Sequence, residues 1–515
     1  MLPKSSISII AFNKLDLTKK CLDSVFAAGG DIELILTNNN SEDSTGSYFD
    51  SLAPRVPGRR LQVVHNLENK GFNKPQNHAL ALSHGKYFVC LNNDAEVPLD
   101  WLYKMEEQFM LNPDAAIVGP SETCCQFKGD FPSWHGSPGN VLEYIEGSCL
   151  MIPADLAKKY TLFAPHYKFA YAEDADLSLR MRAMGKTIHQ ANFTIKHQRG
   201  ATSNGMPGMA EIQMANSTTM TERWANYHKF RRFDLPIVIN RTEALGDVLL
   251  TTPLIRALRD QMPRSELFFE TGLPHVLKYN MKVKKRAPYE HWEEVSKWAR
   301  RISLNMSYEN LLQTHIVSGY FQKALIIPPN EPNWMHTENY WAPEDDAWAD
   351  EQLTRDDGPN RKWVAVHCGP STWDGKAWPE DRFHKVCLWL MDHGFRVVLV
   401  GNLKTRSFAH HLDLRGCTGL QQLGAILARC KFFIGLDSYI LHAAESVGIP
   451  VIGLFGVTDP KFIMTRDTSY SLMGTAPCAG DRHRVTGKHQ MQCGGACIKS
   501  ISFDQVVEKM ELLTK

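Results

Sequence analysis

Several carboxylates in the first 200 residues lie where they could bind a metal ion or accept a proton. The apolar residues 89–91 lead into Asn92-Asn93-Asp94, so polar side chains fall where a buried strand is expected to become a loop. A carboxylate oxygen there can hold a hard divalent cation, which in turn neutralises a diphosphate. Further on, Glu173-Asp174-Ala175-Asp176 opens an expected helix, where a carboxylate can accept a proton from an attacking hydroxyl. Taken singly, a turn and a helix cap are the commoner uses of such residues.

The elements that must position these groups follow from the hydrophobic pattern. Residues 7–11, 33–37 and 86–91 have the pattern of buried strands, and residues 17–28 that of an amphipathic helix. Strands that alternate with helices predict an α/β fold with a mainly parallel, doubly wound sheet. Ligands bind such sheets at the carboxyl ends of the strands, which is where Asp94 is expected.

The order of these pieces, from residue 7 to the His197-Gln198-Arg199-Gly200 segment, resembles glycosyltransferase family 2. That resemblance implies a GT-A fold, a single Rossmann-like domain that binds a nucleotide-sugar donor. It further implies that Asp94 binds Mg²⁺ or Mn²⁺ with His197 as a second contact, and that Asp174 is the catalytic base. Four amides fall on loops expected to bind the donor: Asn38, Asn40, Asn69 and Asn93.

Two positions depart from the family pattern. Asn38 stands where the family usually has an Asp that contacts the donor base, so the identity of that base stays open. Asn92 replaces a frequent carboxylate, which leaves Asp94 to hold the metal nearly alone.

The second half contains another series of strand ends followed by polar loops. Gly246-Asp247 follows a strand expected over 236–239 and precedes a helix expected over 248–259. A strand followed by a small-residue loop is expected over 363–371, another buried strand over 396–401, and a further strand that ends before Asp437. The series resembles glycosyltransferase family 9, the heptosyltransferase-like enzymes, whose GT-B fold has two Rossmann-like halves.

By that resemblance, Asp247 is the base of the second module. The donor diphosphate would be bound without metal by backbone N–H groups and side chains at the loop-to-helix junctions. The residues expected to bind the donor there are Gly369, Ser371, Lys376, Asp437, Ser438, His442 and Thr458.

These resemblances divide the chain into four segments. We expect a GT-A domain over 1–205, a helical linker over 206–235, an N-terminal acceptor half of the GT-B module over 236–345, and a C-terminal donor half over 346–515. Within the linker, residues 209–230 are predicted to form one solvated helix packed between the modules, and Arg223, Lys229, Arg231 and Arg232 give the linker a basic end. The acceptor half is short and basic over 282–301, which suits either an anionic acceptor or an ordinary solvated helix.

Composition bounds the remaining possibilities. A net charge of +1 gives no basic footprint for duplex DNA. The sequence has no apolar run of the roughly 18–20 residues that span a bilayer and no secretion signal at its start, so we expect a cytoplasmic protein, with peripheral association at the inner face of the membrane left open. Zinc at Cys478, Cys493 and Cys497 is considered but disfavoured, because Cys-x₃-Cys lacks the usual spacing and a fourth ligand is not evident.

The sequence therefore predicts a bifunctional, inverting glycosyltransferase that moves sugars from nucleotide-sugar donors to a glycan or lipid-linked glycan. The acceptor would be a precursor of a cell-surface polysaccharide or lipopolysaccharide. Three alternatives stay open: one catalytic module with a glycan-binding or structural partner module, sugar addition to modified bases in DNA, and a non-catalytic glycan-binding protein. Donor, linkage and oligomeric state are not indicated.

Overall fold

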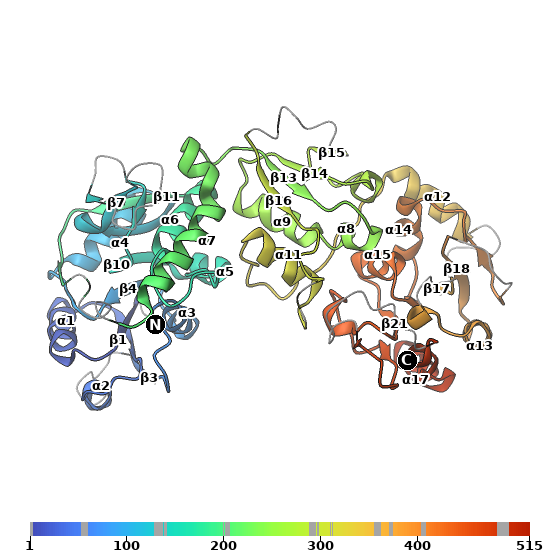
Figure 1. The fold of residues 1–515 in the computed structure, drawn as a ribbon, viewed down its shortest axis with the longest axis horizontal. Coiled ribbons are helices and arrows are strands. Elements are labelled where there is room, and N and C mark those ends of the chain that lie inside the picture. The colour runs from blue at the N-terminus through green and yellow to red at the C-terminus, as the bar shows by residue number, and fades with distance from the viewer. Residues whose placement is uncertain are drawn as a thin grey trace. The chain divides into compact units, whose positions relative to one another are not determined.

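The computed structural model divides the chain into two compact units (Figure 1). The first comprises Met1–Leu235, Asp260–Ser265 and Ile327–Glu331, and the second comprises Pro236–Arg259, Glu266–Ile326 and Pro332–Lys515. The structure describes residues 4–52, 60–127, 137–138, 142–198, 200, 206–287, 295, 298–309, 311, 313–354, 362–369, 374–402, 408–481 and 494–514.

A seven-stranded sheet in the order β11-β6-β10-β4-β1-β2-β3 forms the centre of the first unit. Its strands are β1 (Ser5–Ala11), β2 (Ile32–Asn38), β3 (Arg60–His65), β4 (Tyr87–Asn92), β6 (Ala115–Pro120), β10 (Cys149–Pro153) and β11 (Thr187–Ala191). β10 runs antiparallel to β4 and β6, while β1 is parallel to both β2 and β4. The nearly continuous apolar runs of β1, β2 and β4 are buried, as strands covered on two faces require.

Helices connect these strands, which confirms the predicted GT-A architecture. They are α1 (Leu15–Ala28), α2 (Thr45–Leu52), α3 (Asn73–Leu82), α4 (Trp101–Leu111), α5 (Ala154–Tyr160) and α6 (Glu173–Ala183). A short antiparallel ribbon pairs β5 (Ala95–Glu96) with β12 (Lys196–His197). A small sheet has the order β8-β7-β9, from β8 (Ser137–Pro138), β7 (Cys124–Gln126) and β9 (Tyr144–Ile145).

Helix α7 (Met209–Phe230) has the bounds that the sequence predicts, but its packing differs from that of a solvated linker. Met220, Trp224 and Tyr227 are buried, and Arg223, expected in the basic end of the linker, is 2% exposed. Arg223 is buried because it pairs with Asp176 of α6. Helix α7 is therefore packed into the first unit.

The second unit begins with a parallel four-stranded sheet in the order β15-β14-β13-β16. Its strands are β13 (Ile237–Asn240), β14 (Leu267–Glu270), β15 (Lys285–Ala287) and β16 (Arg300–Ser303), and its helices are α8 (Leu245–Leu249), α9 (Thr252–Gln261) and α11 (Ile316–Ala324). The single helix expected over 248–259 is in fact broken between α8 and α9. The hydroxyls of Thr251 and Thr252 donate to the carbonyls of Val248 and Leu249, which competes with the helical backbone pattern, and Pro253 lacks an N–H.

A second, six-stranded sheet has the order β19-β18-β17-β20-β21-β22. Its strands are β17 (Trp363–His367), β18 (Arg396–Leu399), β19 (Leu412–Asp413), β20 (Phe432–Leu436), β21 (Val451–Phe455) and β22 (Leu472–Met473). The helices of this half are α12 (Pro343–Thr354), α13 (Glu380–Asp392), α14 (Leu420–Ala428), α15 (Tyr439–Val447), α16 (Ala496–Lys499) and α17 (Phe503–Thr514). Two parallel sheets within one unit confirm the predicted GT-B architecture. Among the described residues, no helix has the length and apolar character needed to cross a membrane.

Candidate functional sites

Asp94 and His197 lie side by side at the carboxyl end of β4. The β5–β12 ribbon sets His197 opposite Ala95 and so beside Asp94. His197 Nε2 lies 3.3 Å from Asp94 Oδ1 and 3.4 Å from Asn92 Nδ2, and both the imidazole and the carboxylate are largely buried.

This pair fits a shared divalent cation. No hydrogen bond from the described residues reaches the buried Asp94 Oδ1, although His197 Nε2 faces it. Within the described ranges, no group of three or more His, Cys, Asp and Glu side chains is arranged around one point. An ion held by Asp94 and His197 would therefore take its remaining ligands from a donor diphosphate and from water.

Asp174 lies in the first turn of α6, and both of its carboxylate oxygens accept hydrogen bonds from backbone N–H groups. Gly147 N–H donates to Oδ2 at 2.9 Å, and Ala175 N–H donates to Oδ1 at 2.7 Å. Burial raises the pKa of Asp174 in spite of these hydrogen bonds. Burial, followed by the charge of Asp174, also raises the pKa of the neighbouring Glu173. A buried carboxylate of raised pKa at a helix start suits a general base.

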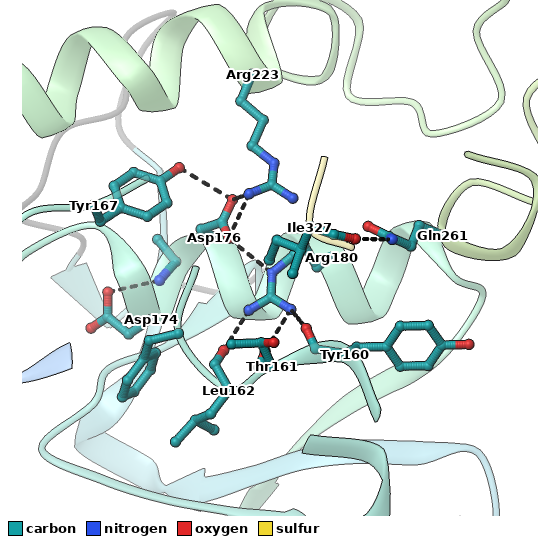
Figure 2. A network of polar contacts seen from close by, with 12 residues as sticks. Tyr160, Thr161, Leu162, Tyr167, Asp174, Asp176, Arg180, Arg223, Gln261 and Ile327 are labelled. Carbon is teal, nitrogen blue, oxygen red and sulfur yellow. Dashed lines mark hydrogen bonds and ion pairs between the residues drawn. The ribbon is translucent and has the colours of Figure 1, made fainter. Parts of the chain in front are cut away.

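Asp176 serves a different purpose from Asp174. Figure 2 shows its buried carboxylate between Tyr167, Arg180 and Arg223. Trp224 Nε1 also donates to it, at 2.8 Å. Burial alone would raise the pKa of Asp176, but the charges of Arg223 and Arg180 and its hydrogen bonds outweigh that effect and lower the pKa. Asp176 is thus a structural anion that joins α6 to α7.

Asn38 and Asn69 are two of the four amides predicted to bind the donor. Their loops are held together by Asn39, which is not among the predicted residues. Asn39 is buried, and its Nδ2 donates to Asn69 Oδ1 at 2.8 Å and to Gly71 O at 2.9 Å. Its Oδ1 accepts hydrogen bonds from Asn66 and Lys70. Asn39 therefore fixes the loop that bears Asn69 against the end of β2, where Asn38 lies.

The other contacts of these amides are local. Asn38 Oδ1 accepts from the N–H of Ser41 at 3.0 Å, and its Nδ2 lies 3.3 Å from His65 Nδ1. Asn40 is exposed in the left-handed conformation (φ 65°), as a turn residue would be. Asn93 is buried and donates to Thr18 Oγ1 of α1 at 2.9 Å. The structure thus ties Asn93 to α1, apart from the loops of Asn38 and Asn69.

In the second unit, Asp247 lies on α8 at the centre of a polar cluster. Its Oδ2 pairs with the Arg241 guanidinium and accepts a hydrogen bond from Tyr308 Oη at 3.0 Å. Arg241 also pairs with Glu309 Oε1 at 2.9 Å, so one cation is shared by two carboxylates. Tyr320 Oη donates to the backbone carbonyl of Asp247 at 3.3 Å. None of these partners belongs to the Gly246-Asp247 motif. Tyr308 and Tyr320 follow the basic segment 282–301, and Tyr320 lies on α11.

Three of the predicted donor-binding residues are joined directly at the carboxyl ends of β20 and β21. Lys376 Nζ lies 2.6 Å from Asp437 Oδ2, which also accepts from Thr458 Oγ1 at 2.7 Å. Burial works against ionisation of Asp437, but the charges of Lys376 and His442 and the hydrogen bonds from Lys376 and Thr458 lower its pKa. A cation held beside polar loops at this edge suits an anionic ligand.

The loops that carry these residues need glycine because their backbones nearly touch. A β-carbon at Gly375 would lie 2.2 Å from Val457 Cγ1, and one at Gly456 would lie 2.1 Å from Gly375 O. This close packing fixes Lys376 beside Thr458.

Two more predicted residues lie around His367 at the end of β17. Ser438 Oγ is 3.3 Å from His367 Nδ1, and a β-carbon at Gly369 would lie 3.0 Å from His367 Nε2. Burial lowers the pKa of His367 to about 4, so this imidazole is neutral at physiological pH. Ser371 lies outside the described residues.

His442 connects the donor side of the second unit to the segment of Asp247. Its Nδ1 is 3.2 Å from Glu445 Oε2. A β-carbon at Gly246 would lie 3.0 Å from His442 Cδ2. Because Asp247 directly follows Gly246, the candidate base and the predicted donor-binding histidine lie on contacting elements.

Two secondary expectations concern the cysteines and the basic segment. Cys478 and Cys497 belong to an apolar cluster with Val457 and Ala479, whereas Cys493 lies outside the described residues.

In the basic segment, Lys282 pairs with Glu338, Lys284 with Glu266 and Arg301 with Glu270. These cations are compensated by acids of the same unit, which favours a structural role over an anionic acceptor site, but the described ends of the segment form strands β15 and β16 rather than the expected solvated helix.

Two family models match this chain. Residues 6–147 match "Glycosyl transferase family 2", and residues 332–491 match "Glycosyltransferase family 9 (heptosyltransferase)".

Curated relatives match parts of the chain. Lipopolysaccharide heptosyltransferase 3 of Escherichia coli strain K12 is 38% identical over 150 residues, which is 27% of this chain and 42% of the relative. The uncharacterized glycosyltransferase EpsJ of Bacillus subtilis strain 168 is 28% identical over 120 residues, covering 23% of this chain and 34% of the relative. The chain thus spans less than half the length of the curated relatives that it matches.

Among solved structures, the family 9 glycosyltransferase of Veillonella parvula DSM 2008 is 19% identical, with a TM-score of 0.43, over 55% of this chain and 98% of that one. The two family matches fall on different units, in the order that the sequence motifs predict. The chain therefore carries a family 2 glycosyltransferase match in its first unit and a family 9 match in its second, the fusion that the sequence motifs imply.

Proposed function

We propose that the chain transfers sugars from nucleotide-sugar donors at two sites, one in each unit, with inversion of the anomeric centre at both. The observation that carries the proposal is that each unit places a largely buried carboxylate near the start of a helix, Asp174 in one and Asp247 in the other. Each unit also brings polar donor-loop residues together at the carboxyl ends of its strands. The lipopolysaccharide heptosyltransferases among the relatives support a heptosyl-type sugar at the second site and a lipopolysaccharide-type acceptor.

In the first unit, Asp94 and His197 would hold Mg²⁺ or Mn²⁺, which neutralises charge on a departing nucleoside diphosphate. Asp174 accepts the proton of the acceptor hydroxyl as its oxygen forms a bond to the anomeric carbon. The bond from that carbon to the diphosphate oxygen breaks on the opposite face, which inverts the centre. The loops of Asn38 and Asn69 orient the nucleotide.

In the second unit, Asp247 accepts the proton in the same way. Lys376 supplies positive charge to the donor diphosphate, in exchange for its present pairing with Asp437. The backbone N–H of Gly369 is available to the same phosphates. If the product of one site is the acceptor of the other, joining both on one chain raises the effective concentration of that acceptor.

Metal dependence tests whether two sites of different chemistry are present. We expect one donor of a panel of UDP-, GDP-, CDP- and ADP-sugars, ADP-heptose included, to be consumed only with Mn²⁺ or Mg²⁺. A different donor should be consumed equally in excess EDTA, because the second site relies on Lys376 and backbone N–H groups. Release of nucleoside diphosphate measures both.

The Asp94→Ala variant should lose the metal-dependent turnover and keep the EDTA-resistant turnover. Glu96→Ala is the matched control, since Glu96 lies two residues after Asp94, on strand β5, and its side chain is 40% exposed. If Asp94→Ala abolishes turnover of every donor, or chelation leaves all donors unaffected, the two-site proposal is wrong.

A further inference from the structure

Helix α7, like Asp174 itself, lies outside the residues matched by either family model, and one of its side chains holds the loop that precedes Asp174. Asn216 is 1% exposed and makes four hydrogen bonds with that loop. Its Oδ1 accepts from Lys168 N–H at 2.9 Å, and its Nδ2 lies within 3.1 Å of the carbonyl oxygens of Lys168, Ala170 and Tyr171. The amide therefore takes the place of a strand partner for a segment that has no regular structure.

The loop needs such support because its backbone is strained. Phe169, Tyr171 and Ala172 have φ values of 60°, 76° and 76°, which residues other than glycine rarely adopt. Residues in such conformations persist where their surroundings over-determine them, and they are common at functional sites. Ala172 directly precedes α6, so the path of this loop sets the position of Asp174 in the first turn.

The opposite side of the loop contacts the segment that bears Asn69. Phe169 O accepts hydrogen bonds from the N–H groups of Phe72 at 2.7 Å and Asn73 at 3.3 Å. A β-carbon at Gly71 would lie 2.5 Å from the same oxygen. The loop is thus bonded to Asn216 and to the predicted donor-binding segment.

A second anchor joins α7 to α6 two turns further along α7. Arg223 and Trp224 of α7 both bond the buried carboxylate of Asp176, two residues after Asp174 (Figure 2 shows the Arg223 contact). Arg180, on the next turn of α6, bonds the same carboxylate and the carbonyls of Tyr160, Thr161 and Leu162. Helix α7 therefore stabilises the start of α6 through two sets of contacts, one with the loop that precedes α6 and one with Asp176.

We propose that Asn216 is a positioning residue for Asp174, so that α7 is part of the first active site. This inference rests on the proposed function of the first unit. The loss of Asn216 frees the loop to relax from its left-handed conformations, which moves Asp174 and lets water reach its carboxylate. The donor loops, which Asn39 holds independently, stay in place.

The test compares Asn216→Ala with Thr218→Ala. Thr218 is exposed on the same helix, and its hydroxyl bonds only the Met214 carbonyl among the contacts described for it. We expect Asn216→Ala to lower kcat for the metal-dependent donor by about 10–100-fold, as a misplacement of a catalytic group does. The KM for that donor should change less than about threefold, since ground-state binding is kept. Thr218→Ala should leave both constants unchanged.

The pH profile separates positioning from general stability. The acid limb of activity should move to lower pH in Asn216→Ala, because the burial that raises the pKa of Asp174 is partly lost. If Asn216→Ala fails to fold, Asn216→Ser, which keeps one donor and one acceptor, should show the same shift with a smaller loss of kcat. Unchanged kcat and an unchanged acid limb in the folded variant overturn the inference. A wild-type chain that consumes no metal-dependent donor overturns the proposed function as well, so the two failures are distinguishable.

Discussion

Replacement of Asp174 by Asn is expected to lower kcat at the first site by about 10²–10⁴-fold, the usual contribution of a general base. The amide has no basic oxygen for the acceptor proton. Its carbonyl can still accept one of the two backbone N–H bonds that Gly147 and Ala175 now make to the carboxylate. The substitution therefore removes the proton acceptor and preserves most of the local structure. EDTA-resistant turnover at the second site should stay at the wild-type level.

Asp155→Asn is a suitable control for this experiment. Asp155 is an exposed carboxylate in the first turn of α5, in the same unit and in the same kind of helix position. Its loss should leave the metal-dependent turnover unchanged. An Asp174→Asn variant that retains wild-type kcat would show that the proton leaves by another route, and Glu173 would then be the nearest carboxylate to test.

The same carboxyl sets the pH dependence at the first site. Because burial raises the pKa of Asp174, its base form is lost at a pH above the ordinary Asp value of 3.8 as the solution is acidified. A carboxyl with a raised pKa in the folded state favours folding at low pH, and this contribution is lost as the pH rises through the folded-state value. The neutral amide of the Asp174→Asn variant therefore removes an unfavourable buried charge at pH 7. We expect the melting temperature of the variant at pH 7 to equal or exceed that of the wild type.

The sequence predicted the parts of these sites that depend on local pattern. The positions of Asp94 and Asp174 at a strand end and a helix start follow from hydrophobic periods of two and 3.6 residues, whereas their roles stay predictions from the family resemblance. The bounds of α7 were also predictable, because Pro207-Gly208 interrupts the pattern just before Met209.

The sequence could not show which side chains of α7 point inward. Its polar and apolar residues are mixed, so no apolar stripe marks a buried face, and Arg223 resembled part of a solvated basic end. What buries Arg223 is the Asp176 carboxylate 47 residues earlier in the chain. Such pairings depend on tertiary packing, which local periodicity does not report. The shared pairing of Arg241 with Asp247 and Glu309 is of the same kind.

Replacement of Asp247 by Asn is expected to lower EDTA-resistant turnover by a similar factor of about 10²–10⁴. Asp247 Oδ2 is occupied by Arg241 and Tyr308, which leaves the other oxygen as the proton acceptor. In the variant, the Asn carbonyl can keep the Arg241 and Tyr308 contacts while the amide nitrogen replaces the reactive oxygen. Arg241 also keeps its bond to Glu309, so no buried cation loses all its partners. The second unit should therefore stay folded, with KM for its donor little changed.

Glu309→Gln supplies the matched control, because Glu309 is the other carboxylate on the same guanidinium. It should retain most of the EDTA-resistant turnover if Asp247 is the base. The opposite result, with Glu309→Gln inactive and Asp247→Asn active, would move the base to Glu309. If Asp247→Asn instead stops turnover of the metal-dependent donor too, the two carboxylates do not serve separate reactions. Arg241→Ala is a poor substitute for either variant, since removing one partner of a buried ion pair costs about 3–5 kcal/mol and would confuse loss of fold with loss of catalysis.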